Sequence, residues 1–148
     1  MRRFGGVPVS GSCGLLLLVA LRSRVRGFEL GIADYHRALA LLFNRELSYN
    51  TVWRNLRKLE STGILRSDLV KSIVRNDLVD SRGVIKVRRF TRVYKRVYEL
   101  NCESKLARRF IGWMAWIARK VFKTRLETIV STRKLINTLS MFLESERS

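Results

Sequence analysis

The chain has 148 residues, of which 47% are hydrophobic and 28% are charged, and its formal net charge is +18. This length supports one modest core with an additional element but not two independent domains of typical size, and the composition is that of a globular protein rather than a disordered one. The charge excess makes a polyanion the expected partner, and nucleic acid, an anionic membrane and acidic protein all satisfy it.

The N-terminal third predicts an arm followed by two helices. Residues 1–13 are rich in Gly and Ser and predict a flexible arm. The apolar run from Leu15 to Val25 predicts a buried first helix that breaks at Gly27. Residues 28–43 predict a second helix, whose inner side is expected to consist of Ile32, Tyr35, Leu39 and Leu42 or Phe43.

Residues 47–65 predict a short, well-delimited helix. Ser48 or Asn50 can cap its first free N–H groups, and Gly63 can adopt the left-handed conformation that ends it. The apolar residues recur at spacings of four and three and predict one buried stripe made of Val52, Leu56 and Leu59. The opposite face carries cations, amides and aromatics, which are the side chains that contact phosphates and base edges: Tyr49, Asn50, Trp53, Arg54, Arg57 and Lys58.

A long β-hairpin is predicted after this helix. The turn sequence Asp80-Ser81-Arg82-Gly83 separates two runs rich in β-branched and aromatic residues. Pairing residues whose numbers sum to 163 places opposite charges and apolar residues across from each other, and it predicts the pairs Asp77 with Lys86, Ile73 with Phe90, Val70 with Val93 and Asp68 with Lys95. Charge on both faces predicts that the hairpin projects from the protein.

The hairpin is also strongly basic. Residues 82–96 include seven cations and no acid, which is more than an exposed strand edge needs for protection against aggregation. We therefore expect contact with nucleic-acid backbone, and the tip would present Arg82, Lys86, Arg88 and Arg89.

Helical periodicity returns at residue 103 and continues almost to the end. One long bent helix, or two helices that meet near Ser131 and Thr132, fits the pattern. Its apolar surface exceeds what the preceding ninety or so residues are expected to cover. We therefore predict homodimerisation through Leu106, Phe110, Trp113, Ile117, Leu126, Ile129, Ile136 and Leu139. An alternative is a membrane-surface helix around Trp113 and Trp116, but the continuous periodicity favours packing.

No residue pattern indicates catalysis, a metal or a cofactor. His36 is the only histidine and is expected to be a surface or half-buried helix residue, and Cys13 and Cys102 have no second ligand at metal-binding spacing. We therefore predict a protein that is not an enzyme. The cysteine usage fits a reducing, cytoplasmic setting, and no apolar run approaches the ~20 residues that span a bilayer.

With these elements in place, residues 14–125 resemble the PadR-like family of winged-helix transcription regulators. Three segments carry the resemblance: LLLL with GFEL (residues 15–18 and 27–30), LSYNTVWRNLRKLESTGIL (residues 47–65), and RVYELN (residues 96–101). The hairpin is longer than is usual in the family, and Asn101 stands where the family normally has Thr. The resemblance implies a dimer whose recognition helices enter successive major grooves. It also implies that Trp113 or Trp116 can help to line a pocket for a small-molecule effector.

The sequence therefore predicts a mainly α protein with a β-hairpin: an arm (residues 1–13), a winged helix-turn-helix DNA-binding domain (residues 14–102) and a helical dimerisation region (residues 103–146). The predicted function is sequence-preferring binding of double-stranded DNA by a homodimeric, nucleoid-associated transcription regulator. Ser48 is included in the predicted DNA-binding set, in which bases would be read by Tyr49, Asn50, Thr51 and Arg54. Phosphates or the adjacent minor groove would be bound by the cations Arg57, Lys58, Arg82, Lys86, Arg88 and Arg89. The alternatives are a nonspecific architectural DNA-binding protein and an assembly protein that uses the winged helix for protein contacts.

Overall fold

The structure is a computed structural model that describes residues 3–4, 7–8 and 11–145. In chain order its elements are strands β1 (Arg3–Phe4) and β2 (Val7–Pro8), helix α1 (Gly11–Arg26), strand β3 (Leu30–Gly31), helices α2 (Ile32–Phe43) and α3 (Tyr49–Ser61), strands β4 (Leu65–Arg75), β5 (Leu78–Val79), β6 (Ile85–Val87) and β7 (Phe90–Leu100), and helices α4 (Lys105–Lys120), α5 (Leu126–Ser131) and α6 (Arg133–Ser145). The prediction of a helical protein with an antiparallel hairpin is confirmed.

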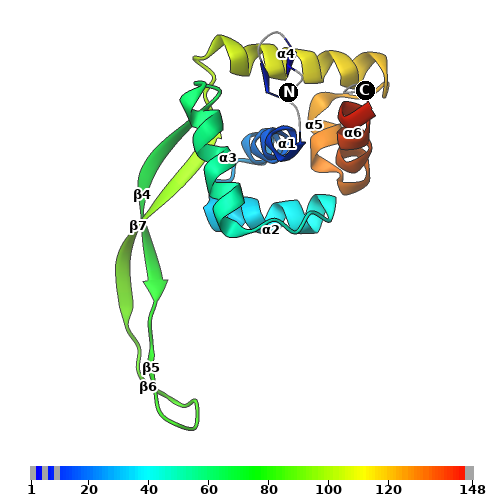
Figure 1. Ribbon diagram of the computed structural model, residues 1–148. Helices are drawn as coiled ribbons and strands as arrows, with labels where there is room; N and C mark the ends of the chain where they lie inside the picture. Colours follow the sequence, from blue (N-terminus) through cyan, green and yellow to red (C-terminus); the bar gives the residue numbers. More distant parts are fainter. Residues whose placement is uncertain (1–2, 5–6, 9–10, 146–148) are drawn as a thin grey trace.

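Helix α1 lies at the centre of the helical body, and the other helices are arranged around it (Figure 1). Every residue from Cys13 to Leu21 is buried, because a helix that is apolar around its whole circumference must be covered on all sides. The cover comes from α2, α3, α5, α6 and β7. The predicted buried helix is confirmed, and Gly27 follows its last residue with φ +76°.

Part of the predicted N-terminal arm belongs to regular structure. Arg3–Phe4 pairs antiparallel with Val7–Pro8, and residues 11–13 form the start of α1. The boundary predicted at residue 13 is therefore wrong. The remainder of the predicted arm, residues 1–2, 5–6 and 9–10, lies outside the described residues.

The second predicted helix is shorter than expected because its first residues contribute a strand. Leu30–Gly31 pairs with β7, which makes a three-stranded antiparallel sheet in the order β3-β7-β4. Helix α2 starts at Ile32, and the Asp34 carboxylate accepts a hydrogen bond from the Gly31 N–H at 2.9 Å. This bond satisfies one of the free N–H groups at the start of the helix. The predicted inner side is confirmed at two buried residues, Tyr35 and Leu39.

The hairpin formed by residues 65–100 projects far from the body, as predicted (Figure 1). Strands β4 and β7 pair along eleven residues each, from Leu65 opposite Leu100 to Arg75 opposite Phe90. The short strands β5 and β6 continue the hairpin to its tip. Beyond its base, the side chains on both faces are exposed or half-buried.

The predicted register of the hairpin is wrong by two residues. Paired numbers sum to 165 along β4 and β7, so Ile73 lies opposite Arg92 and Val70 opposite Lys95, rather than opposite Phe90 and Val93. Similarly, Asp68 lies opposite Val97. Because the error is an even number of residues, each side chain still lies on the predicted face.

Two local features account for this difference. The Asp80 carboxylate accepts hydrogen bonds from the N–H groups of Arg82 and Val84, both at 2.9 Å, and this widens the turn by one residue. A bulge between Leu78 and Val79 adds the second residue. The predicted pair of Asp77 with Lys86 is consequently absent, and Asp77 forms an ion pair with Arg75 instead.

The C-terminal region forms three helices rather than one or two. The predicted break near Ser131 is present between α5 and α6, and a second break separates α4 from α5. That second break contains Lys123 in the left-handed conformation, with φ +54°.

The residues predicted to form a dimer interface lie in the core of the single chain. Those with fully buried side chains are Phe110, Ile117, Ile129, Ile136 and Leu139, and those half-buried against the same core are Leu106, Trp113 and Leu126. The prediction that they form a separate dimerisation surface is wrong for this arrangement, because α1 offers apolar surface all round and α5 and α6 cover part of it. The C-terminal helices therefore share one core with the rest of the chain, and Leu143 is the last residue of that core. The predicted region 103–146 does not pack separately over this span.

Candidate nucleic-acid interface

Helix α3 is fixed at its start by a capping contact. The Ser48 hydroxyl accepts a hydrogen bond from the Thr51 N–H at 3.1 Å and lies 2.8 Å from the Thr51 hydroxyl. Of the two predicted caps, Ser48 is therefore the one used. Thr51 is half-buried and its hydroxyl is engaged by the cap, so it is less available to a base than the sequence suggested.

His36 of α2 positions the segment that leads into α3. Its Nε2 lies 2.8 Å from the carbonyl oxygen of Leu47, and because a carbonyl only accepts, Nε2 is the nitrogen that donates. The imidazole also meets the ring of Tyr49 edge to face, with 6.2 Å between centroids. The half-buried location predicted for His36 is confirmed, and the contacts give it a positioning role.

The inner face of α3 determines which side chains point outward. Val52, Leu56 and Leu59 are fully buried, as predicted, and the Asn55 amide donates to the Ser12 hydroxyl of α1 at 2.5 Å. The outward residues are exposed: Tyr49, Asn50, Trp53, Arg54, Arg57 and Lys58. The helix ends at Ser61, and Gly63 follows shortly after it with φ +87°.

One outward cation is held against an aromatic ring. The Arg57 guanidinium lies over the Trp53 ring, 5.0 Å from its centroid, which restrains both side chains on the surface. Trp53 was recognised as part of this face but was not among the predicted contact residues. The geometry adds it to the candidate interface.

The hairpin carries a second group of exposed cations. The four predicted tip residues, Arg82, Lys86, Arg88 and Arg89, are all exposed. They lie at the end of the hairpin that is remote from α3 (Figure 1). The cations of the tip and those of α3 therefore form two separate exposed groups rather than one cluster.

The base of the hairpin supplies residues that sequence reasoning did not select. On one face, Lys71 lies opposite Tyr94, and Leu69 lies opposite Arg96. Tyr94 is 68% exposed, and this large exposed aromatic among cations suits contact with a nucleic-acid backbone and its sugars. The signal was present in the basic run of residues 82–96, but only the tip was selected from it.

An open groove joins the start of α3 to the base of the hairpin. Its volume is about 500 Å³, and its lining includes Ile32 and Ala33 of α2, Tyr49 of α3, and Tyr94 and Arg96 of β7. The structure thus brings a residue predicted to read bases next to the hairpin. This continuity was not readable from the sequence.

The hairpin is anchored to α2 by a partly buried ion pair. Lys95 Nζ donates to the Asp34 carboxylate at 2.7 Å. Burial by itself would raise the pKa of the Asp34 carboxyl, but the hydrogen bonds from Lys95 and from the Gly31 N–H outweigh it and lower that pKa below its ordinary value. The base of the hairpin is therefore held in place more firmly than its tip.

A buried tyrosine makes a second anchor. The Tyr35 hydroxyl donates to the carbonyl oxygen of Tyr98 in β7 at 2.8 Å. Burial raises the pKa of Tyr35, and the nearby Glu99 and Asp34 carboxylates raise it further. Tyr35 therefore remains a neutral donor across the physiological pH range.

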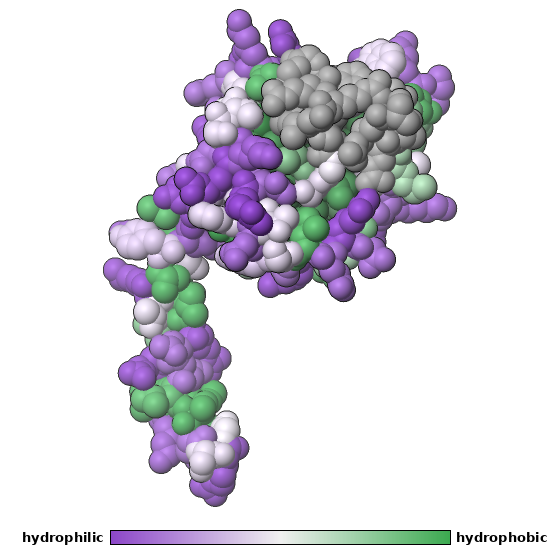
Figure 2. Space-filling view, viewed as in Figure 1, coloured by the Kyte–Doolittle hydropathy of each residue, from purple (hydrophilic) through white to green (hydrophobic). Residues whose placement is uncertain are grey.

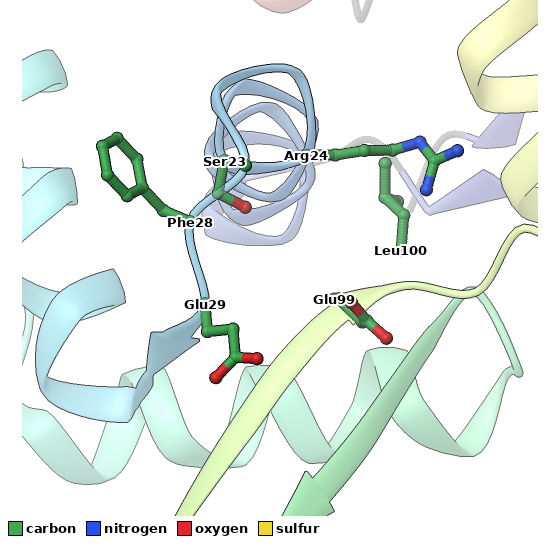
Figure 3. Close-up of a pocket in the computed structure, with 7 residues that line it drawn as sticks. Ser23, Arg24, Phe28, Glu29, Glu99 and Leu100 are labelled. Carbon is green, nitrogen blue, oxygen red and sulfur yellow. The ribbon is translucent and has the colours of Figure 1, made fainter. Parts of the chain in front are cut away.

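A different pocket lies where α1 ends and β3 approaches β7 (Figure 3). Its volume is about 230 Å³. The side chains of Glu29 and Glu99 both contribute carboxylates there, whereas Phe28 points away from them (Figure 3). Glu99 is paired with Arg66 at 2.6 Å. Arg24 lines the pocket as well, so its lining carries charges of both signs and is not a purely basic surface.

The two tryptophans of the predicted effector pocket occupy different environments. Trp113 packs against the core, and Trp116 is 49% exposed on the outer side of α4. A small apolar pocket of about 110 Å³ lies elsewhere, between α1 and α2. The effector site therefore stays a prediction from the resemblance.

No family model, curated protein or solved structure matches this chain. Within residues 3–4, 7–8 and 11–145, no group of three or more His, Cys, Asp and Glu side chains is arranged to hold a metal ion. In the same part of the chain, none of the helices combines the length and the apolar character needed to cross a membrane. The functional assignment accordingly depends on the geometry of α3 and the hairpin.

Proposed function

We propose that this protein binds double-stranded DNA through the exposed face of α3 and the hairpin, and that it acts as a sequence-preferring transcription regulator of the winged-helix type. The observation that carries the proposal is the groove in which Tyr49 of α3 meets Tyr94 and Arg96 of the hairpin. It connects a helix with an amide-bearing, cationic outer face to a long basic extension.

The order of the elements supports the winged-helix assignment. Helix α1 is followed by a short strand, two helices and a two-stranded hairpin, and the sheet order is β3-β7-β4. Helices α2 and α3 are in contact. In a helix-turn-helix protein the second of two such helices enters the major groove, which is the role we propose for α3.

The exposed residues divide into two proposed roles. Tyr49, Asn50 and Arg54 would approach base edges, because they lie on the outer side of a helix whose inner side is fixed. Arg57, Lys58 and the hairpin cations would contact phosphates. In this proposal the hairpin residues contribute affinity for DNA, and the outer face of α3 contributes sequence preference.

A second candidate function is architectural DNA binding without sequence preference. The net charge of +18 favours it, because nonspecific affinity for DNA is dominated by cation–phosphate contacts. The two candidates differ in whether the α3 face discriminates among sequences. A homodimer, which the resemblance implies, stays a prediction that sedimentation can test.

Fluorescence anisotropy with Arg54→Ala separates the two candidates. Binding would be measured to the duplex upstream of the protein's own gene and to a scrambled duplex, across a salt titration. We expect the wild type to prefer the first duplex, and the variant to lose ~1–3 kcal/mol of binding free energy on that duplex and little on the scrambled one.

Arg24→Ala provides a matched control, because Arg24 is an exposed arginine at the end of α1 and lies outside the proposed interface. Equal losses on both duplexes for Arg54→Ala would remove it from base reading and favour the architectural function. Absence of binding to either duplex by the wild type would contradict both candidates.

A further inference from the structure

Helix α4 presents a second basic surface that the proposed function does not use. Its outward stripe repeats at helical spacing, and all its members are exposed: Lys105, Arg108, Arg109, Gly112, Trp116, Arg119 and Lys120. Residues 104–126 of the sequence contain no acid. We call this stripe the α4 face. Figure 2 shows hydrophilic side chains at the outer rim of the body where α4 lies in Figure 1.

The orientation of α4 is fixed by its other side. Phe110, Met114 and Ile117 are fully buried in the core. Rotation of the helix to expose them would be unfavourable, because it would bring three large apolar side chains out of the core into water. The cations of the α4 face are therefore held outward together.

The composition of the α4 face selects among possible partners. Insertion into a membrane surface needs a broad apolar face, but the apolar side of α4 is occupied by the core and Trp116 is the one large apolar side chain on the outward stripe. A second copy packed on this face would bring like charges together, which is unfavourable. A polyanion satisfies the cations and can pack its sugars against Trp116.

The α4 face continues into a shallow hollow at the turn that follows it. This hollow has a volume of about 540 Å³, and its lining consists of Arg119, Lys123, Thr124, Arg125 and Thr128. All five side chains can donate hydrogen bonds. Arg125 is ion-paired with Glu127 at 3.8 Å. The other cationic and hydroxyl donors around this open hollow fit the oxygens of a phosphate backbone.

The α4 face begins beside the end of α3, where the Asn101 amide donates to the Gly63 carbonyl oxygen, and it extends away from the interface proposed for α3. Helix α4 crosses the end of the body farthest from the tip of the hairpin, whereas α3 and the hairpin lie along one flank (Figure 1). A straight duplex placed along α3 and the hairpin leaves free the far part of the α4 face, around Arg119 and Lys120. A second stretch of DNA can occupy it.

We propose that the α4 face binds a second segment of DNA backbone, so that one protein molecule bridges two duplex segments. This inference depends on the proposed function, since the first segment is the one held by α3 and the hairpin. Contacts at the α4 face would be phosphate contacts and would carry no sequence preference.

A bridging assay tests this inference. One duplex is fixed to beads, and recovery of a second, fluorescent duplex on the beads is measured as protein is added. The test variant combines Arg108→Gln, Arg119→Gln and Lys120→Gln. The control variant removes the same charge from exposed positions on other helices, with Arg24→Gln, Arg133→Gln and Lys134→Gln.

We expect the test variant to lose at least tenfold in bridging while its affinity for a single duplex changes less than twofold. The control variant is expected to bridge like the wild type. Undiminished bridging by the test variant would overturn the proposal and would instead fit a dimer that holds one duplex with each α3.

Two further measurements keep this inference distinct from the proposed function. The first measurement is the affinity for a single duplex. If the double variant Arg54→Ala and Arg57→Ala keeps this affinity while the test variant loses it, then α4 rather than α3 is the primary DNA surface. That result would contradict the proposed role of α3 and would also overturn bridging as proposed. The second measurement is binding to vesicles of phosphatidylglycerol. If the test variant loses the vesicle binding of the wild type but still bridges two duplexes, the α4 face is a membrane surface and the proposal is overturned.

Discussion

The helical body and the hairpin contain the same apolar residue types, but the body buries them and the hairpin leaves many of them exposed. In the body, α1 is covered on every side and its leucines are buried. In the hairpin, Leu69 and Ile73 are among many large apolar side chains left exposed, because each strand alternates them with cations and the opposite faces have no covering element. Residues of the body therefore determine stability, and residues of the hairpin are available for binding.

Figure 2 shows the same contrast on the surface. Apolar and hydrophilic patches alternate along the hairpin, whereas the coloured part of the body's surface in this view is largely hydrophilic (Figure 2). An extension that buries little apolar surface contributes little to folding. Its length is therefore better explained by contact with a partner than by stability.

The strongest test of this contrast removes a core side chain. Leu17 in α1 is fully buried, and Leu17→Ala is expected to lower the free energy of unfolding by ~2–5 kcal/mol through lost burial and the cavity left behind. Leu69→Ala, at a position that is 52% exposed in the hairpin, should change it by less than ~0.5 kcal/mol. Urea denaturation monitored by circular dichroism measures both values, and similar losses for the two variants would contradict the division between body and hairpin.

A second test shortens the hairpin. Replacement of residues 77–88 by a two-residue Asn-Gly turn removes Arg82, Lys86 and Arg88 while leaving β4 and β7 intact. We expect the slope of log affinity for DNA against log salt to decrease by about three, because each lost phosphate contact removes nearly one released counterion. The unfolding midpoint should hardly move. An unchanged salt slope would show that the tip does not touch DNA.

The smallest expected effect lies at the junction between the two regions. Asp34 caps α2 and pairs with Lys95 of the hairpin, so Asp34→Asn should lower the free energy of unfolding at pH 7 by about 1 kcal/mol. Because the pKa of Asp34 is lowered in the folded state, its contribution is present above the ordinary carboxyl pKa of about 4 and is lost as pH falls through the lowered value.

The pH dependence of this difference separates the ion pair from a general charge effect. Denaturation curves at several pH values between 7 and 2 should show the wild type and Asp34→Asn converging below about pH 4. Glu29→Gln removes an exposed carboxylate outside this junction and serves as the control. A difference between wild type and Asp34→Asn that stays constant over this range would show that the charge of Asp34 does not stabilise the junction.

Local features of the sequence were sufficient to predict α3 and the general form of the hairpin. Ser48, the apolar stripe through Val52 and Leu56, and Gly63 act within a few residues of one another, so the limits and the buried face of α3 follow from local hydrogen bonding and periodicity. The turn at Asp80 to Gly83 is local in the same way and predicted the antiparallel direction of the pairing, but the wider turn and the bulge moved the register by two residues, which left each side chain on its predicted face.

Tertiary structure decided how the distant segments combine. The C-terminal apolar residues were compatible with either a partner chain or this chain's own core, and only the position of α1 showed that Ile129 and Ile136 are buried within the same chain. The pairing of Leu30–Gly31 with β7, and the groove between Tyr49 and Arg96, likewise join residues far apart in sequence. Periodicity tells which side of an element is apolar, but the partner that covers that side is selected by competition among all the apolar surfaces of the folded chain.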